Sequence, residues 1–178
     1  MSVNTKKLCQ QIKRDAKQTL LWTRDEQGHH ITNKHYLASF KDLPLDVLST
    51  LLGVYLREPE MGQTLKIIYG EYQNDYTYID HSSIPKSDTA ETEGKITAYM
   101  RKYEDRLERV VMVGDRFTLI QEGYAALADG GKVQGFHAEN SPVFLANGMI
   151  VVLPIRVEQE LLQGELLKIT NHFEYSIQ

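Results

Sequence analysis

The stretch Ser141-Pro-Val-Phe-Leu-Ala-Asn-Gly-Met-Ile-Val-Val-Leu-Pro-Ile-Arg156 decides the fold class. It holds the apolar run 143–145 and all but the last residue of the run 149–157, and the β-branched and large apolar residues of both runs favour strands. Between the runs stands Asn147-Gly148, a pair that readily adopts the positive φ angles of a tight hairpin turn. The stretch therefore predicts an antiparallel β-hairpin.

The region before this hairpin alternates between predicted helices and strands. A strand over 132–137 follows Asp129-Gly-Gly131, whose residues accept the left-handed geometry that ends a helix. Apolar residues at helical spacing predict helices over 95–107 and 116–128, and a short apolar run predicts a strand over 109–113. The residues that form the two helical stripes are Ile96, Tyr99, Met100, Tyr103 and Leu107 in the first helix, and Phe117, Ile120, Tyr124 and Leu127 in the second.

The first part of the chain shows the same mixture of elements. Pro44 suits the first position of a helix, since its missing N–H has no partner there. The elements predicted in this part are helices over 4–17 and 44–56, a short strand over 19–22 and a hairpin with strands over 65–69 and 72–80, whereas residues 29–41 are ambiguous. Helices combined with antiparallel hairpins indicate the α+β class.

We expect a single domain over 1–178 with two halves, 1–81 and 94–157, each consisting of helices and antiparallel strands. The polar segment 82–93 is rich in Ser, Thr, Asp and Glu, which favours a loop that joins the halves. Residues 158–178 form a C-terminal extension.

The composition is that of an ordinary soluble protein, with 42% hydrophobic and 25% charged residues and a net charge of −4. The single cysteine, Cys9, cannot form an internal disulfide or a Cys-rich zinc site, which favours a reducing compartment. No apolar run approaches the roughly 20 residues that span a bilayer. We therefore expect a cytoplasmic protein with no membrane partner. The net charge excludes a basic coat over the whole surface but not a local basic face.

Cations gather on one face of each of two predicted helices. On helix 4–17 they fall on an arc of about 120°, opposite the apolar arc, and on helix 95–107 they follow one flank of the apolar stripe. Contacts from such faces to phosphates would be independent of sequence and sensitive to salt, although lysine and arginine also simply keep helix surfaces soluble. The candidate DNA-contact residues are Lys6, Lys7, Lys13, Arg14, Lys17, Lys95, Lys102 and Arg106.

The chain contains no motif typical of catalysis or metal binding. HExxH, GxSxG and a Gly-rich phosphate loop are all missing from it. His29, His30 and His35 lie close in sequence but lack the spacing of metal ligands. We therefore predict no catalytic residues, no metal and no cofactor. The alternative from the enzyme class is a small His-dependent metalloenzyme.

Residues 110–156 resemble the closing segment of the last domain of bacterial DNA-polymerase sliding clamps, the beta clamps. The similar features are a strand over 110–113, a helix over 116–128, a strand over 132–137, the run Ser141-Pro-Val-Phe-Leu145 and the final Met149-Ile-Val-Val-Leu-Pro-Ile-Arg156, which has the family form hhhPhR, where h is apolar. The resemblance implies a duplicated α+β domain, with helices that line a channel around duplex DNA and an outer layer of antiparallel strands.

The same resemblance implies a pocket for protein partners. In beta clamps the hPhR segment contributes to an apolar pocket that holds short peptides of replication proteins. The corresponding partner-pocket candidates in this chain are Leu153, Pro154, Ile155 and Arg156.

Two features depart from the family. A clamp subunit has three such domains, whereas 178 residues fit one, and family members end near the matching arginine, whereas this chain continues beyond Arg156. Short clamp-like proteins resemble accessory proteins of bacteriophages, so we expect a phage or mobile-element origin.

Our leading hypothesis is a non-enzymatic, clamp-like accessory protein that acts in DNA replication or its modulation. It would bind duplex DNA non-specifically through phosphates, bind replication or host proteins, or do both. The alternative is a phage-encoded protein-interaction module, an inhibitor or adaptor with no DNA binding. Because exposed sheet edges must be paired or blocked, we also expect a homo-oligomer, namely a homodimer formed by strand addition.

Overall fold

The computed structural model describes residues 3–73, 78–81, 84–138, 140–156 and 164. The helices in this part of the chain are α1 (Thr5–Asp15), α2 (Leu45–Tyr55), α3 (Glu122–Ala125) and the short 3₁₀ helix η1 (Ser87–Thr89). The strands are β1 (Thr19–Asp25), β2 (Gly28–Thr32), β3 (Tyr36–Phe40), β4 (Gln63–Ile68), β5 (Glu71–Gln73), β6 (Thr92–Tyr103), β7 (Arg106–Val113), β8 (Arg116–Gln121), β9 (Val133–Gly135), β10 (Val143–Leu145) and β11 (Ile150–Val152). The predicted α+β class is confirmed.

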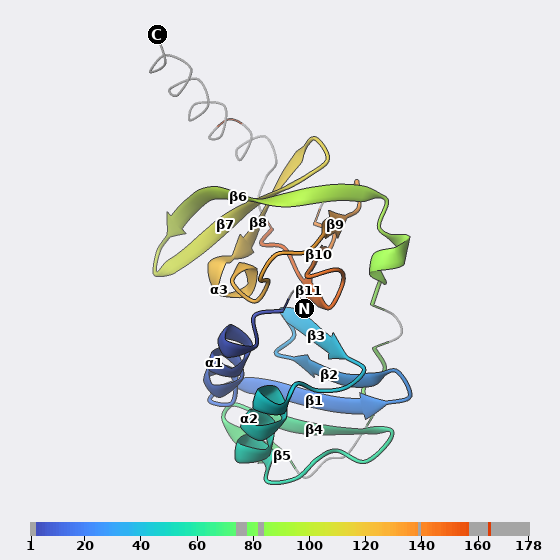
Figure 1. The fold of residues 1–178 in the computed structure, drawn as a ribbon. Coiled ribbons are helices and arrows are strands. Elements are labelled where there is room, and N and C mark those ends of the chain that lie inside the picture. The colour runs from blue at the N-terminus through green and yellow to red at the C-terminus, as the bar shows by residue number, and fades with distance from the viewer. Residues whose placement is uncertain (1–2, 74–77, 82–83, 139, 157–163, 165–178) are drawn as a thin grey trace.

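The described strands form one sheet of eleven, in the order β5-β4-β1-β2-β3-β11-β10-β9-β6-β7-β8 (Figure 1). All neighbours in it are antiparallel. The order contains one pattern twice. The meander β1-β2-β3 is followed by α2, β4 pairs with β1 and β5 pairs with β4. The meander β6-β7-β8 is followed by α3, β9 pairs with β6 and β10 pairs with β9. Strand β11 lies between the two runs.

The three α-helices lie in a row, with α1 between α2 and α3 (Figure 1). Helix α1 begins after Asn4, whose side chain caps it by accepting a hydrogen bond from the Lys7 N–H at 3.1 Å. The Asn4 N–H donates to the carbonyl oxygen of Leu127 at 2.8 Å, which fixes α1 beside the chain that leaves α3. Leu8 and Ile12 on α1 are fully buried, as the predicted apolar arc requires.

The main core lies between these helices and the sheet. Trp22 of β1 is fully buried, and its ring lies 5.9 Å from the ring of Tyr55 on α2. The Tyr55 hydroxyl donates to the Leu20 carbonyl at 2.7 Å, so its polar end is also satisfied. Successive side chains of a strand point to opposite faces of the sheet. Leu37, Phe144 and Val151 accordingly form an apolar cluster separate from the main core. The segment that leads to β6 packs on this cluster through Ile84 and Ala90.

Most predicted elements are present with small changes in their bounds. The predicted strand 72–80 is one exception, because β5 ends at Gln73, residues 78–80 form no strand and residues 74–77 lie outside the described part. The predicted helices 4–17 and 44–56 correspond to α1 and α2, and the ambiguous 29–41 forms β2 and β3. The hairpin β10–β11 is confirmed, with Asn147 and Gly148 in its turn at φ angles of 58° and 82°. The C-terminal extension 158–178 lies outside the described residues, apart from residue 164.

The predicted helix 95–107 is wrong, because this region forms the hairpin of β6 and β7. Its turn contains Glu104, which adopts a positive φ of 52°, and Tyr103 pairs with Arg106 across it. The register shifts between Ile96 and Met100. This bulge breaks the period of two along the strand, so the apolar spacing resembled that of a helix.

The predicted helix 116–128 is also wrong over its first half. Residues 116–121 form β8, which pairs with β7 along its whole length, and α3 is only one turn long. Pairing with a neighbouring strand outweighed the helical spacing of the apolar residues.

No helix in the described part of the chain is long and apolar enough to cross a membrane.

Candidate functional site

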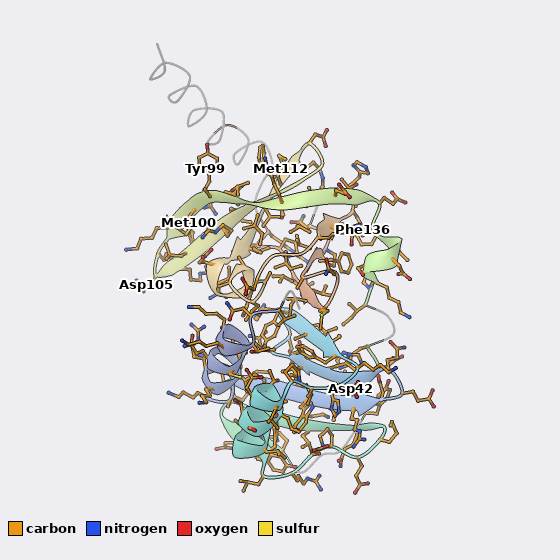
Figure 2. All side chains as sticks on the ribbon, viewed as in Figure 1. Asp42, Tyr99, Met100, Asp105, Met112 and Phe136 are labelled. Atoms are coloured by element: carbon orange, nitrogen blue, oxygen red, sulfur yellow. The ribbon has the colours of Figure 1, made fainter. Side chains whose placement is uncertain are left out.

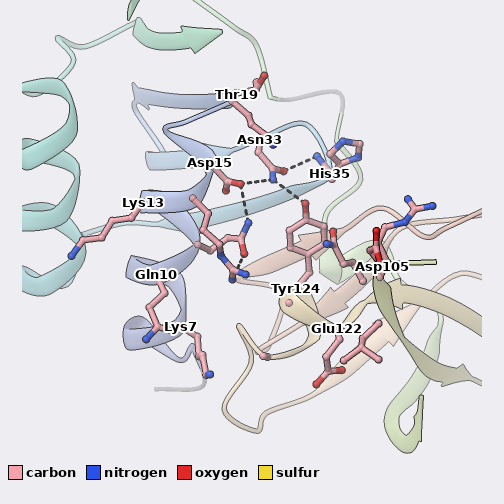
Figure 3. A pocket seen from close by; sticks show the side chains of 18 residues that line it. Lys7, Gln10, Lys13, Asp15, Thr19, Asn33, His35, Asp105, Glu122 and Tyr124 are labelled. Atoms are coloured by element: carbon pink, nitrogen blue, oxygen red, sulfur yellow. Dashed lines mark hydrogen bonds between the residues drawn. The ribbon is translucent and has the colours of Figure 1, made fainter. Parts of the chain in front are cut away.

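A groove with a volume of about 1040 Å³ lies between the first and second strand runs (Figure 3). Its walls come from α1, from the β2–β3 turn, from the β6–β7 turn and from the end of β8 with α3. We call it the α1 groove. Four of its lining residues are exposed cations: Lys7, Lys13, Arg14 and Arg106.

The α1 groove brings together four of the eight predicted DNA-contact residues. Three of them come from α1, and Arg106 comes from β7, which is far away in the sequence. The other four candidates, Lys6, Lys17, Lys95 and Lys102, are exposed but do not line the groove. Arg106 therefore meets the cations of α1 from a strand, although the sequence predicted it on a helix.

The floor of the groove is a buried network of polar side chains (Figure 3). The Asp15 carboxylate, only 7% exposed, accepts hydrogen bonds from Gln11 Nε2 at 2.8 Å, Asn33 Nδ2 at 3.0 Å and the Tyr36 hydroxyl at 3.1 Å. Asn33 Nδ2 also donates to the Tyr124 hydroxyl oxygen at 2.9 Å. The network thus connects α1 to the β2–β3 turn and to α3.

Burial raises the pKa of Asp15 above its ordinary value, although three hydrogen bonds and the nearby Arg14 act in the opposite direction. The same network supports Arg14, whose Nη2 donates to Gln11 Oε1 at 2.7 Å. Gln11 therefore holds one basic side chain of the groove in place while it satisfies Asp15.

The two acidic side chains near the cations of the groove, Glu122 and Asp105, differ in their surroundings. Glu122 is occupied by Arg109, which donates to its two carboxylate oxygens at 2.6 and 2.7 Å. Asp105 is exposed at the tip of the β6–β7 hairpin, as Figure 2 shows. Close to it, the Tyr103 ring receives the guanidinium groups of Arg101 and Arg106 at 5.6 and 6.0 Å from its centroid.

Sequence reasoning missed the polar floor of the groove. One signal was present: at the helical period, Asp15 falls about 20° from Leu8, on the apolar side of α1. An acid at that position needs buried donors. Nothing in the sequence indicated that Asn33 and Tyr124 would supply the remaining contacts.

A second, smaller cavity of about 160 Å³ lies between the sheet and the segment after β5. We call it the β-face cavity. His30 lines it and has a partner on each ring nitrogen: Ser39 Oγ lies 2.9 Å from Nδ1, and Asp25 Oδ1 lies 3.1 Å from Nε2. The ring of His81 lies 5.2 Å from that of His30, and His81 Nε2 lies 3.1 Å from Thr23 Oγ1.

Electrostatics differ among the side chains of the β-face cavity. Burial works against ionisation of Asp25, but hydrogen bonds from the Gln27 N–H and from His30 outweigh it, so the pKa of Asp25 is lowered. Burial, followed by the proximity of His30, lowers the pKa of His81.

The three clustered histidines go to three different places. His29 Nδ1 accepts a hydrogen bond from Trp22 Nε1 at 3.2 Å, His30 lines the β-face cavity and His35 lines the α1 groove. Within the described ranges, no group of three or more His, Cys, Asp or Glu side chains is arranged to hold a metal ion.

The partner-pocket candidates Leu153, Pro154, Ile155 and Arg156 follow β11 and line neither the α1 groove nor the β-face cavity. The Ile155 N–H donates to the Leu119 carbonyl at 2.7 Å, and its side chain packs on Val110 and Leu119. Leu153, by contrast, is 48% exposed. The segment therefore covers part of the β8 edge and leaves Leu153 open to contact.

Comparisons with known proteins add no relative: no family model matches the chain, and neither curated proteins nor solved structures give a match.

Proposed function

We propose that this chain is a clamp-like accessory protein of DNA replication that binds the phosphate backbone of duplex DNA at the α1 groove, without chemistry at that site. The observation that carries the proposal is the meeting of exposed cations from α1 with Arg106 of β7 in one groove. A phosphate backbone suits a groove with several exposed cations, since it presents a row of anions.

The arrangement of the elements supports the same proposal. A row of helices backed by antiparallel strands, with one strand order used twice, is what the resemblance to sliding clamps implies. Helix α1 is the middle helix of that row and carries three of the four cations. Its two groove lysines, Lys7 and Lys13, are exposed, so DNA can approach them without rearrangement of the core.

Binding of a labelled duplex, followed by fluorescence anisotropy across a salt series, tests the proposal. Lys7→Glu/Lys13→Glu should weaken binding at least about tenfold and flatten the dependence of log K on log salt, because two phosphate contacts are lost. Lys41→Glu/Lys132→Glu is the matched control, since both lysines are exposed, lie outside the groove and give the same change in net charge. Equal affinities for the two variants, or no binding at low salt, would refute the groove as a DNA site.

The exposed Leu153 favours a second candidate, a protein-interaction module such as a phage-encoded inhibitor or adaptor. An exposed apolar side chain directly after a strand is a suitable anchor for a partner peptide. Retention of a replication protein from nuclease-treated bacterial lysate by the wild type, and its loss with Leu153→Asp, would favour this candidate over DNA binding.

In either role we infer a cytoplasmic protein that self-associates. Of the two end strands of the sheet, β8 is partly covered by Ile155, which leaves β5 as the edge for strand addition between two copies. Light scattering at high concentration tests this inference, and a monodisperse monomer would contradict it.

A further inference from the structure

Ser39, His30 and Asp25 form a continuous hydrogen-bonded chain inside the β-face cavity. His30 and Ser39 face each other in the register of β2 and β3, which brings Ser39 Oγ to 2.9 Å from His30 Nδ1. On the other side of the ring, Asp25 Oδ1 lies 3.1 Å from Nε2. Nucleophile, base and orienting carboxylate are thus linked in the order that a serine nucleophile requires.

Two properties of the Asp25–His30–Ser39 hydrogen-bond series indicate a role beyond linking the strands. His30 is only 6% exposed, so its ring is held by the sheet and shielded from bulk water. Ser39 nevertheless borders an open space, since Ser39 and His30 both line the cavity of about 160 Å³. A substrate atom placed there would meet a hydroxyl whose proton already has an acceptor.

We propose that Ser39 is a nucleophile activated by His30, that Asp25 positions His30, and that the site hydrolyses small carboxylic esters. The inference is independent of DNA binding, because the β-face cavity and the α1 groove share no lining residue. The volume of the cavity restricts the acyl group to a short chain. Leu37 lies two residues from Ser39 on the same strand face and lines the cavity, so it provides an apolar wall for that chain.

The reaction balances with water as the only co-reactant. Ser39 Oγ forms a bond to the ester carbonyl carbon, and its proton passes to His30 Nδ1 while Nε2–H donates to Asp25. The C–O bond to the alcohol then breaks, and the imidazolium returns its proton to the departing alkoxide. Water attacks the acyl-serine by the same route, giving the carboxylic acid and free Ser39.

The negative charge on the former carbonyl oxygen needs a donor from a side chain. The Ser39 N–H cannot supply it, because it donates to the Met149 carbonyl within the sheet at 2.9 Å. Lys86 is the cationic side chain that lines the same cavity, and we assign it this role.

Labelling with diisopropyl fluorophosphate tests the proposal, because Ser39 Oγ would displace fluoride and the adduct is visible in the intact mass. We expect one adduct per chain, mapped to Ser39 by peptide sequencing, and a burst of p-nitrophenol from p-nitrophenyl acetate. Ser39→Ala should abolish both signals. Ser49→Ala should keep them, since Ser49 is an exposed serine of α2 that lines neither the β-face cavity nor the α1 groove.

Two further measurements separate a catalytic role from a structural one. His30→Gln should slow labelling about 100-fold or more, because Ser39 then lacks its base. Asp25→Asn should lower kcat for p-nitrophenyl acetate with little change in KM, as expected of a positioning residue that acts through His30. Absence of an adduct, an adduct that persists in Ser39→Ala, or an unchanged labelling rate in His30→Gln would overturn the proposal and leave the three residues as a link between β-strands.

Discussion

Asn33 Nδ2 lies 2.9 Å from the Tyr124 hydroxyl oxygen, although 91 residues separate the two in sequence. The same amide donates to Asp15 at 3.0 Å, and Asn33 Oδ1 accepts from the N–H groups of His35 and Tyr36. One side chain in the β2–β3 turn therefore satisfies groups on both walls of the α1 groove. Together with the hydrogen bond from the Asn4 N–H to Leu127, it therefore links α1 to the region of α3.

Asn33→Ala should lower the free energy of unfolding by about 1–3 kcal/mol, because it leaves the buried Asp15 carboxylate and two backbone N–H groups short of partners. Tyr124→Phe removes one acceptor only and should cost about 1 kcal/mol or less. Urea denaturation of the three proteins measures both values. Equal stabilities for Asn33→Ala and the wild type would show that the network does not hold the groove together.

Stability should fall when the pH is lowered below about 6.5. Burial lowers the pKa values of His29 and His81 in the folded protein below the ordinary 6.5. The unfolded chain therefore takes up protons first as the pH falls through 6.5, which favours unfolding. The stabilising contribution is complete above that pH. Urea midpoints at pH 7.5 and 5.5 should differ less for His81→Gln than for the wild type, and a parallel shift in both would contradict this assignment.

Arg101 should be necessary for stability, because it is the partner of the buried Glu108 carboxylate. Its side chain is 1% exposed, and its Oε2 accepts from Arg101 Nε and Nη2 at 3.0 and 2.7 Å. Arg101→Met would leave a buried carboxylate without this partner and should cost about 3–5 kcal/mol. The double variant Arg101→Met/Glu108→Leu should recover most of that loss in thermal or urea unfolding. A double variant no more stable than Arg101→Met would show that charge burial is not the cause.

Gly148 should resist substitution more strongly than Gly130. Both have positive φ angles, 82° and 77°, so alanine would strain the backbone at either position by about 1–2 kcal/mol. At Gly148 an added Cβ would also collide with the Ser87 side chain, whereas at Gly130 it would meet open space. Gly148→Ala should therefore show the larger drop in melting temperature, and equal drops would place Ser87 farther from the β10–β11 turn.

Leu153 and Ile155 should respond differently to a charge. Leu153→Asp replaces a half-exposed side chain and should leave the melting temperature nearly unchanged, since surface substitutions cost within about 0.5 kcal/mol. Ile155→Asp places a carboxylate against Val110 and Leu119 and should destabilise the protein clearly. Thermal unfolding of both variants checks this. An unfolded Leu153→Asp would remove that variant as a probe of partner binding.

The elements predicted correctly are those in which local pattern and tertiary packing agree. Helix α1 has one apolar and one basic arc, and the β10–β11 turn has the one residue pair that suits it best. The region 95–107 failed because a bulge between Ile96 and Met100 produced helical spacing in a strand. The pairing of β6 with β7 and β9 decides between a helix and a strand here, and a single sequence does not show this long-range pairing.

The candidate sites were predictable to different degrees. The basic arc of α1 is visible in the sequence because helical period alone defines it. The β-face cavity is not, because Asp25, His30 and Ser39 meet through the register of three strands. Residues 29–41 were ambiguous in sequence, so the partner of His30 had no predicted position.

The central place of β11 has a consequence for how the protein is made. This strand joins β3 to β10, yet it is the last strand of the described chain to leave the ribosome. Until residues 150–152 emerge, the β3 edge lacks its neighbour and the two strand runs have no shared sheet. During translation the β3 edge of the first run therefore stays unpaired until β11 is synthesised. In that period, pairing of this edge with another nascent chain competes with its pairing with β11.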